Sequence, residues 1–101
     1  MSKIVIQMEM EDITHKEYDA ILKEMKAQGK LANAHRPSHV AFEKDGKWCV
    51  VDVWDSAEEL NNFVSTTLGP IFGKLGITPP VPHVYPVYNY MGKEVEEPIS
   101  A

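Results

Sequence analysis

His39 and Asp52 are the pair of side chains whose types and spacing best suit chemistry. Asp45-Gly46 lies between two β-prone runs, and Asp-Gly in that setting predicts a two-residue hairpin turn, because glycine supplies the positive φ that such a turn needs. Counting outward from the turn pairs Lys44 with Lys47 and then His39 with Asp52. A carboxylate beside an imidazole fixes its tautomer and raises its basicity. His39 and Asp52 are therefore candidate catalytic residues, with His39 as the base.

The same two residues also suit a purely structural role. A buried polar pair can satisfy its own hydrogen bonds and fix the register of two strands. Perturbed pairs of titratable groups mark functional sites only in a statistical sense. The sequence leaves the structural and the catalytic interpretations open.

Two tryptophans lie on the same predicted strand face as this pair. Trp48 and Trp54 can stack on a flat substrate or fill an interface, and both uses are common for aromatic residues on sheets. A metal site is not expected, because His35, His39 and His83 fall on different segments without ligand spacing. Cys49 sits within a strand and is expected to be an inert, buried thiol on the helix side of the sheet.

Alternation along the hairpin separates two faces. One face is purely apolar and is expected to meet helices: Val40, Phe42, Cys49, Val51 and Val53. The other face, with Trp48, Val50 and Trp54 beside the His–Asp pair, is expected to stay open. An open face this apolar is large for a monomer, so we expect a homodimer through the open sheet face, with a small hydrophobic or aromatic ligand in its cavity.

The first half of the chain predicts a strand followed by a helix. Lys3 to Met10 is β-branched and then alternates, as in a strand. Thr14 with Glu17 forms a capping box, so a helix begins at His15 and ends near Gly29. The apolar side chains of that helix recur at helical spacing: Tyr18, Ile21, Leu22 and Met25.

After the hairpin strands, Ser38 to Lys44 and Lys47 to Asp55, the capping residue Ser56 starts a second helix, which Gly69-Pro70 is expected to interrupt. His83 to Tyr90 predicts a last strand at a sheet edge, because Pro86 cannot donate to a ladder. The order βαββαβ predicts an α+β, ferredoxin-like fold with a four-stranded antiparallel sheet.

Length and composition restrict the class of protein. The chain has 101 residues, with 10 basic and 15 acidic side chains and one cysteine, which predicts a single domain over residues 1–101 with a mobile tail over 91–101. A formal charge of −5 disfavours nucleic-acid partners and anionic membranes. No apolar run is long enough for a signal peptide or a membrane span, and nothing indicates a disulfide, so we expect a cytoplasmic protein.

Several stretches resemble a known family. They are Asp45-Gly46-Lys47-Trp48, Val51 to Ser56, then Phe63, Leu68, Pro70 and Gly76, and finally Pro86-Val87-Tyr88-Asn89. The pattern resembles the dimeric α/β-barrel superfamily, in particular small bacterial proteins related to the antibiotic biosynthesis monooxygenase domain. That resemblance implies two ferredoxin-like protomers that join into a barrel, and it adds Tyr88 and Asn89 to the candidate substrate-binding residues.

The resemblance also bears on cofactors. The haem-degrading branch of the superfamily is marked by an asparagine on its first strand, whereas this chain has Ile4-Val5-Ile6-Gln7-Met8 there. That branch is therefore poorly supported, and no cofactor is expected.

The leading hypothesis is a small-molecule pocket used for cofactor-independent oxygenation of an aromatic or polyketide-like compound. A base would generate a carbanion that reacts with oxygen, while apolar walls exclude water. The alternative is a non-catalytic dimer for ligand binding or assembly. RNA binding by the sheet requires stacking aromatics with basic neighbours, which this acidic chain lacks.

Overall fold

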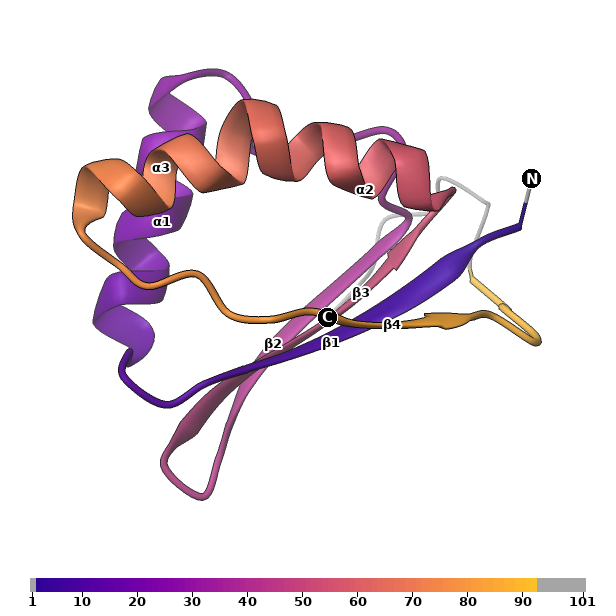
Figure 1. The fold of residues 1–101 in the computed structure, drawn as a ribbon, viewed down its shortest axis with the longest axis horizontal. Coiled ribbons are helices and arrows are strands. Elements are labelled where there is room, and N and C mark those ends of the chain that lie inside the picture. The colour runs from indigo at the N-terminus through magenta and orange to yellow at the C-terminus, as the bar shows by residue number, and fades with distance from the viewer. Residues whose placement is uncertain (1, 93–101) are drawn as a thin grey trace, which may run out of the picture.

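Four antiparallel strands form one sheet in the computed structural model, which describes residues 2–92. The strands are β1 (Ile4–Met10), β2 (Ser38–Lys44), β3 (Lys47–Trp54) and β4 (His83–Pro86), in the order β2-β3-β1-β4. The helices lie together on one face of the sheet (Figure 1). This arrangement confirms the predicted ferredoxin-like α+β fold.

The hairpin between β2 and β3 has the predicted turn and register. Asp45 and Gly46 both have positive φ, 51° and 81°, as the turn that matches strand twist requires. Lys44 pairs with Lys47, and His39 lies directly opposite Asp52. The count from the turn was therefore right at every pair.

The capping box that predicts the first helix is present. Helix α1 (His15–Ala27) begins after Thr14, whose backbone N–H donates to Glu17 Oε1 at 2.6 Å. The chain leaves the helix through Gly29, which has a φ of 72°. A glycine in this left-handed conformation is a common way to end a helix.

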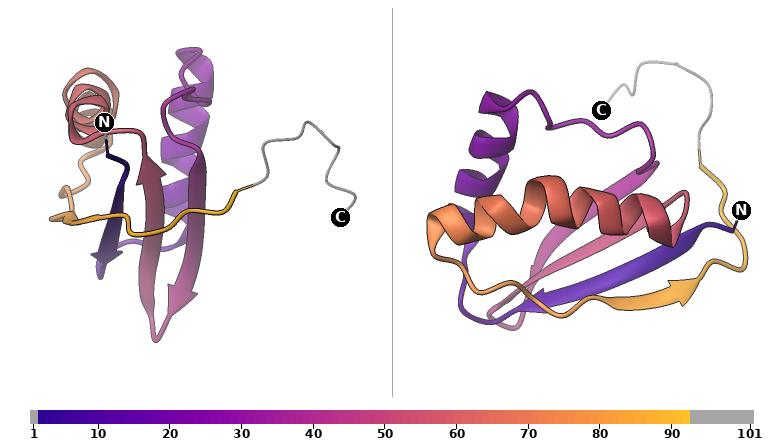
Figure 2. Two further views of the ribbon diagram at one scale, coloured as in Figure 1. Left: turned by 90° about the vertical axis from the view of Figure 1, so that its right-hand side faces the viewer. Right: turned by 45° about the horizontal axis from the view of Figure 1, so that its top comes forward.

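The second helical segment is longer than predicted. Helix α2 (Ala57–Phe63), the π-helical turn η1 (Val64–Leu68) and helix α3 (Gly69–Leu75) follow one another without a break, and Figure 2 shows them as one continuous rod. The predicted interruption at Gly69-Pro70 is wrong. Pro70 has no backbone N–H to donate to the preceding turn, and it follows directly after the π-helical turn, in the first turn of α3.

The backbone hydrogen bonds around that proline differ from those of a regular helix. The Gly69 N–H bonds the Val64 carbonyl, and a Cβ at Gly69 would lie only 3.0 Å from that oxygen. In a regular helix the residue at 70 would donate to the Thr66 carbonyl. Here Lys30 Nζ approaches that oxygen at 3.5 Å instead.

The two faces of the sheet are reversed relative to the prediction. The core beneath the helices contains Ile6, Met8, Val50 and Trp54, which share the face of His39 and Asp52. The face of Val40, Phe42, Val51 and Val53 is the uncovered one, and Val40 and Phe42 are exposed. Cys49 is buried but lies on this uncovered face, not on the helix side.

Strand β1 explains the reversal. Its apolar residues Ile6 and Met8 are opposite Asp52 and Val50, whereas Gln7 alternates to the other face. Strand β1 therefore places its large apolar side chains on the face that also carries the two tryptophans. The hairpin face that carries only apolar side chains is therefore not the face that the helices cover.

Strand β4 is an edge strand, as predicted, but it is shorter. It ends at Pro86, although Val87 N–H still donates to the Lys3 carbonyl at 3.0 Å. Residues 76–82 connect α3 to β4 and pass beside β1 (Figure 1). Most of the predicted tail, residues 93–101, lies outside the described residues. No helix among residues 2–92 is long and apolar enough to cross a membrane.

Two neighbouring valines test which face is covered. Val50→Thr places a hydroxyl in the core and should lower the free energy of unfolding by about 1–3 kcal/mol, because Val50 is 4% exposed. Val51→Thr, on the uncovered face, should lower it by less, because Val51 is only partly buried within one chain. Urea unfolding followed by circular dichroism measures both, and a larger loss for Val51→Thr would contradict the observed faces.

Candidate functional site

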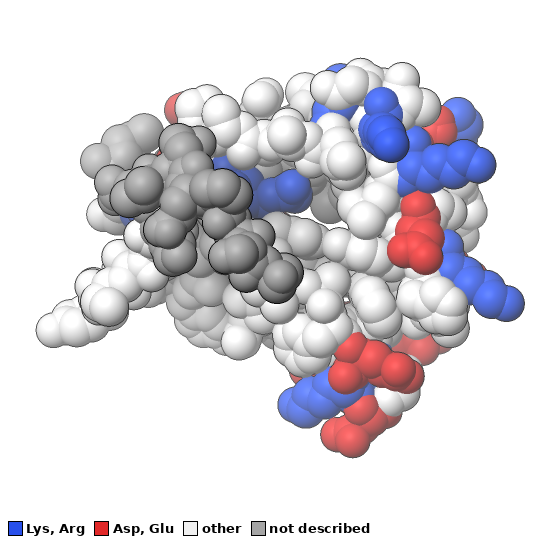
Figure 3. Space-filling model, turned by 180° about the vertical axis from the view of Figure 1, so that it is seen from behind, with Lys and Arg blue, Asp and Glu red and all other residues white. Residues whose placement is uncertain are grey.

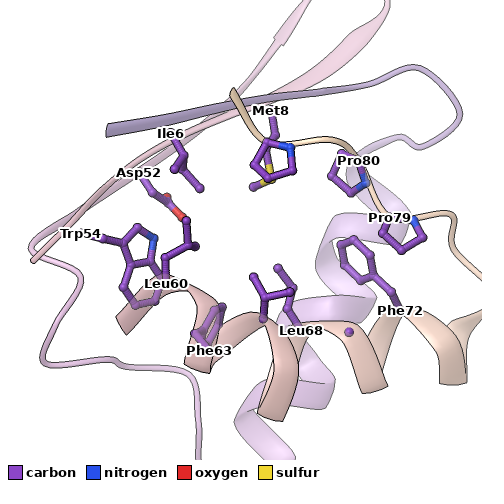
Figure 4. A pocket seen from close by; sticks show the side chains of 13 residues that line it. Ile6, Met8, Asp52, Trp54, Leu60, Phe63, Leu68, Phe72, Pro79 and Pro80 are labelled. Atoms are coloured by element: carbon purple, nitrogen blue, oxygen red, sulfur yellow. The ribbon is translucent and has the colours of Figure 1, made fainter. Parts of the chain in front are cut away.

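A cavity of about 70 Å³ lies between the sheet and the long helical rod (Figure 4). Apolar side chains from β1, β3, the rod and the proline-rich connector line it, including Ile6, Met8, Trp54, Leu60, Phe63, Leu68, Phe72, Pro79 and Pro80. Asp52 is the only charged side chain in this lining. The π-helical turn contributes Val64 and Leu68, so the irregularity of the helix shapes the wall of the cavity.

A second cavity, of about 50 Å³, lies on the α1 side. It contains three polar side chains that the first lacks, Tyr18, Arg36 and His39. The two cavities share five wall residues: Met8, Asp52, Phe63, Leu68 and Phe72. Asp52 is the only polar residue of the five, so one carboxylate lies in the apolar wall between the two cavities.

The Asp52 carboxylate is buried and hydrogen-bonded to His39. Its side chain is 6% exposed, that of His39 is 27% exposed, and Asp52 Oδ1 contacts His39 Nδ1. An ionised carboxylate only accepts hydrogen bonds, so the shared proton is on Nδ1. The pairing across the hairpin is as predicted, whereas the position beneath the helices replaces the predicted position on the open face.

Tyr18 extends this pair toward the protein surface. Its hydroxyl lies 2.5 Å from His39 Nε2, and its ring packs against Trp48 with centroids 5.2 Å apart. Burial, and secondly the negative charge of Asp52, raise the pKa of the Tyr18 phenol above its ordinary value of about 10. Sequence reasoning assigned Tyr18 only to the apolar stripe of α1. The sequence did contain one indication of this role, because the apolar stripe that includes Tyr18 is the side of α1 that faces the sheet.

The two tryptophans occupy different environments. Trp54 is fully buried, lines the first cavity, and its indole Nε1 has no hydrogen-bond partner among the described residues. Figure 4 shows this nitrogen on the side of the ring nearest Asp52. Trp48 packs on the core beside Tyr18 and is absent from the wall of either cavity, but its indole Nε1 is also buried without a hydrogen-bond partner among the described residues. A buried donor without a partner is costly, and because Trp48 carries one away from both cavities, the unpaired donor of Trp54 does not by itself mark a ligand site.

Arg36 brings a positive charge to the same region. Its guanidinium carbon lies 5.8 Å from the Trp54 ring centroid and 5.6 Å from that of Phe63, distances typical of cation–π contacts. The residue lines the second cavity beside His39. Sequence reasoning missed Arg36, because no sequence pattern relates the loop before β2 to Trp54 on β3.

The last two candidate residues lie away from the cavities. The Tyr88 side chain is fully exposed and Asn89 is exposed as well, and neither lines either cavity. In the described part of the chain, no three His, Cys, Asp or Glu side chains gather as metal ligands would. The face seen in Figure 3 carries acidic and basic side chains side by side, mostly toward one side, without a continuous basic surface.

Comparison with known proteins identifies the fold. No family model and no curated protein matches the chain. A protein of Chloroflexus aurantiacus J-10-fl, provisionally described as an antibiotic biosynthesis monooxygenase, superposes with a TM-score of 0.62 at 18% identity, over 90% of this chain and 98% of that one. A conserved protein of Methanosarcina mazei Go1 gives 0.59 at 11% identity, over 84% and 92%. The chain shares their fold. The predicted resemblance is thereby confirmed for the architecture.

Alkaline titration tests the environment of Tyr18. Since its pKa is raised in the folded protein, the folded state holds a proton that the unfolded chain releases near pH 10. Its contribution to stability is complete below that pH and is lost as pH rises through the folded pKa. Urea unfolding from about pH 9 to 11.5 should show a steeper loss for the native protein than for Tyr18→Phe.

Lysines titrate in the same range, so a matched control is needed. Tyr88→Phe removes a fully exposed hydroxyl and should leave the slope unchanged. Asp52→Asn should reduce the slope in part, because burial is the larger cause of the raised pKa. Equal slopes for Tyr18→Phe and Tyr88→Phe would contradict this account.

Proposed function

We propose that the chain is a homodimeric enzyme that binds a small apolar or aromatic compound beneath its helices and removes a proton from it, for cofactor-independent oxygenation. The observation that carries this proposal is a buried carboxylate, hydrogen-bonded to an imidazole, at the junction of two apolar cavities. The oxygenase chemistry is suggested by the description of the Chloroflexus protein with the same fold.

Asp52 is the group best placed to act as the base. It lines both cavities, whereas His39 lines only the second, and one His39 nitrogen is already bonded to Asp52. The apolar walls exclude water and so strengthen any interaction with a developing charge. Proton transfer to Asp52 from a phenol or an enolisable ketone leaves an anion with electron density on a ring or α carbon, and molecular oxygen adds to that carbon to give a peroxide. The peroxide takes back the proton from Asp52, and loss of water from the hydroperoxide breaks the O–O bond and leaves a carbonyl, so that oxygen is the only oxidant.

The cavity size restricts the ligand. An engineered cavity of about 150 Å³ accepts one benzene ring, and each of the two cavities is smaller. A ring therefore enters only if shared wall residues move, and Met8 and Leu68 are the flexible ones. This supports a one-ring or short-chain ligand, at the lower end of the predicted aromatic and polyketide-like range.

The uncovered sheet face supports the dimer. Its apolar side chains come from all four strands: Val5, Val40, Phe42, Val51, Val53 and Tyr85. Val40, Phe42 and Tyr85 are 52%, 41% and 49% exposed, which is unusual for a contiguous surface on a monomer. A second copy that packs face to face would bury them.

The small volume gives specific support to a second candidate, a non-catalytic dimer in which His39 and Asp52 only satisfy each other. Under that interpretation the cavities are packing defects, and no compound binds at micromolar to millimolar concentration. The two candidates differ in what the following experiment measures.

Oxygen uptake with one-ring hydroquinones and enolisable ketones tests the catalytic proposal. Asp52→Asn keeps the shape and the contact to His39 but removes the base, so uptake should fall by about 10²- to 10⁴-fold. Leu68→Trp should abolish binding of phenol, seen in the Trp54 indole resonance, because it fills the shared wall. Uptake that both substitutions leave unchanged would refute the role of Asp52 and of this cavity. Uptake no faster than in buffer with every compound would favour the non-catalytic dimer.

Light scattering over a dilution series tests the assembly. The native protein should have the mass of a dimer at micromolar concentration. Val51→Asp puts a charge on the centre of the uncovered face and should give a monomer, since burying an unpaired carboxylate in an interface costs several kcal/mol, on the order of 2–5. Asn61→Asp, which adds the same charge at an exposed position of α2, serves as the control. A monomeric native protein with folded spectra would refute the dimer.

A further inference from the structure

We propose that Tyr18 is a positioning residue of this site: its hydroxyl donates to His39 Nε2 and so makes the hydrogen bonds run in one direction, Tyr18 to His39 to Asp52. The inference deepens the proposed function and rests on it for its catalytic meaning, but the hydrogen-bond order itself does not depend on any ligand. It concerns a residue from α1 that neither the hairpin register nor the fold comparison singles out.

The direction follows from counting protons along the three groups. The ionised Asp52 carboxylate accepts only, so His39 Nδ1 carries a hydrogen. A neutral imidazole has one N–H, which leaves Nε2 as a bare acceptor. The Tyr18 hydroxyl, 2.5 Å from Nε2, is then the donor.

One further contact holds the phenol in place, because the Tyr18 ring packs against Trp48. The Tyr18 and His39 rings are nearly parallel, with an interplanar angle of 3° and centroids 6.1 Å apart, as expected of two rings joined edge to edge by this hydrogen bond. Because burial raises the pKa of this phenol, its proton is retained at every pH where the protein would work. The hydroxyl is therefore a permanent donor, and not one that ionises during a reaction.

The consequence is a division of roles within the site. Because His39 Nδ1–H donates to Asp52 and Nε2 accepts from Tyr18, neither nitrogen of His39 is free to bind a compound in the cavity. The second carboxylate oxygen of Asp52 is then the acceptor that meets the ligand. Hydrogen bonds aligned in one chain polarise one another, which holds the carboxylate in one orientation toward the cavity.

The test is a long-range ¹H–¹⁵N correlation spectrum of the histidine rings, recorded at a pH where the His39 imidazole is neutral. The chain has four histidines, and His39→Gln identifies the resonances of this one. The native protein should show the proton on Nδ1 and an Nε2 resonance shifted upfield of a free acceptor nitrogen. Tyr18→Phe, which keeps the ring contacts, should move Nε2 downfield, while Tyr85→Phe should leave it in place.

A proton on Nε2 in the native protein, or an Nε2 resonance that Tyr18→Phe does not move, would overturn the inference. If Tyr18→Phe does not fold, protein made with 3-fluorotyrosine, a stronger donor, should shift Nε2 further upfield, and no shift would again refute it. The spectrum needs no ligand. Failure of phenol to bind would therefore refute the proposed function and leave the hydrogen-bond order standing.

Discussion

The hydrogen bond between Asp52 and His39 is the interaction on which the rest of this site depends. A carboxylate that is 6% exposed is costly to bury unless it is paired and hydrogen-bonded. The neighbours of Asp52 on β1 and β3 are apolar, so only the edge strand β2 can supply a polar partner on this face. The hairpin turn at Asp45-Gly46 sets that partner, because a slip of one residue would send His39 to the opposite face.

The long helical rod is the second constraint, since it closes the space over that carboxylate. A regular helix through Pro70 would leave a backbone carbonyl without its donor and crowd the proline ring. Lys30 Nζ approaches the Thr66 carbonyl that lacks this donor. The π-helical turn directly precedes Pro70, and it places Leu68 between the two cavities. Such turns occur often at functional sites. Under the proposed function, this irregular part of the helix forms a wall that would have to move for a compound to enter.

Sequence reasoning could predict the features that depend on local chemistry. The turn, the capping box before α1 and the His39–Asp52 register each follow from a few neighbouring residues. It failed on which sheet face the helices cover, because that choice depends on β1, whose Ile6 and Met8 join the tryptophan face. Tyr18 and Arg36 were missed for a related reason: they come from α1 and a loop, and only tertiary packing brings them to the strand.

The reversed faces change how a dimer and the site would relate. Had the tryptophan face been open, two copies would have shared one cavity. Instead the cavities lie beneath the helices of one chain, and the uncovered face is on the other side of the same strands. Along β3, Val51 and Val53 alternate with Asp52 and Trp54, so a partner that packs on the valines would hold the backbone that carries the carboxylate and the indole. Dimerisation would then act on the site through the stiffness of one strand, without contributing a side chain to the cavity.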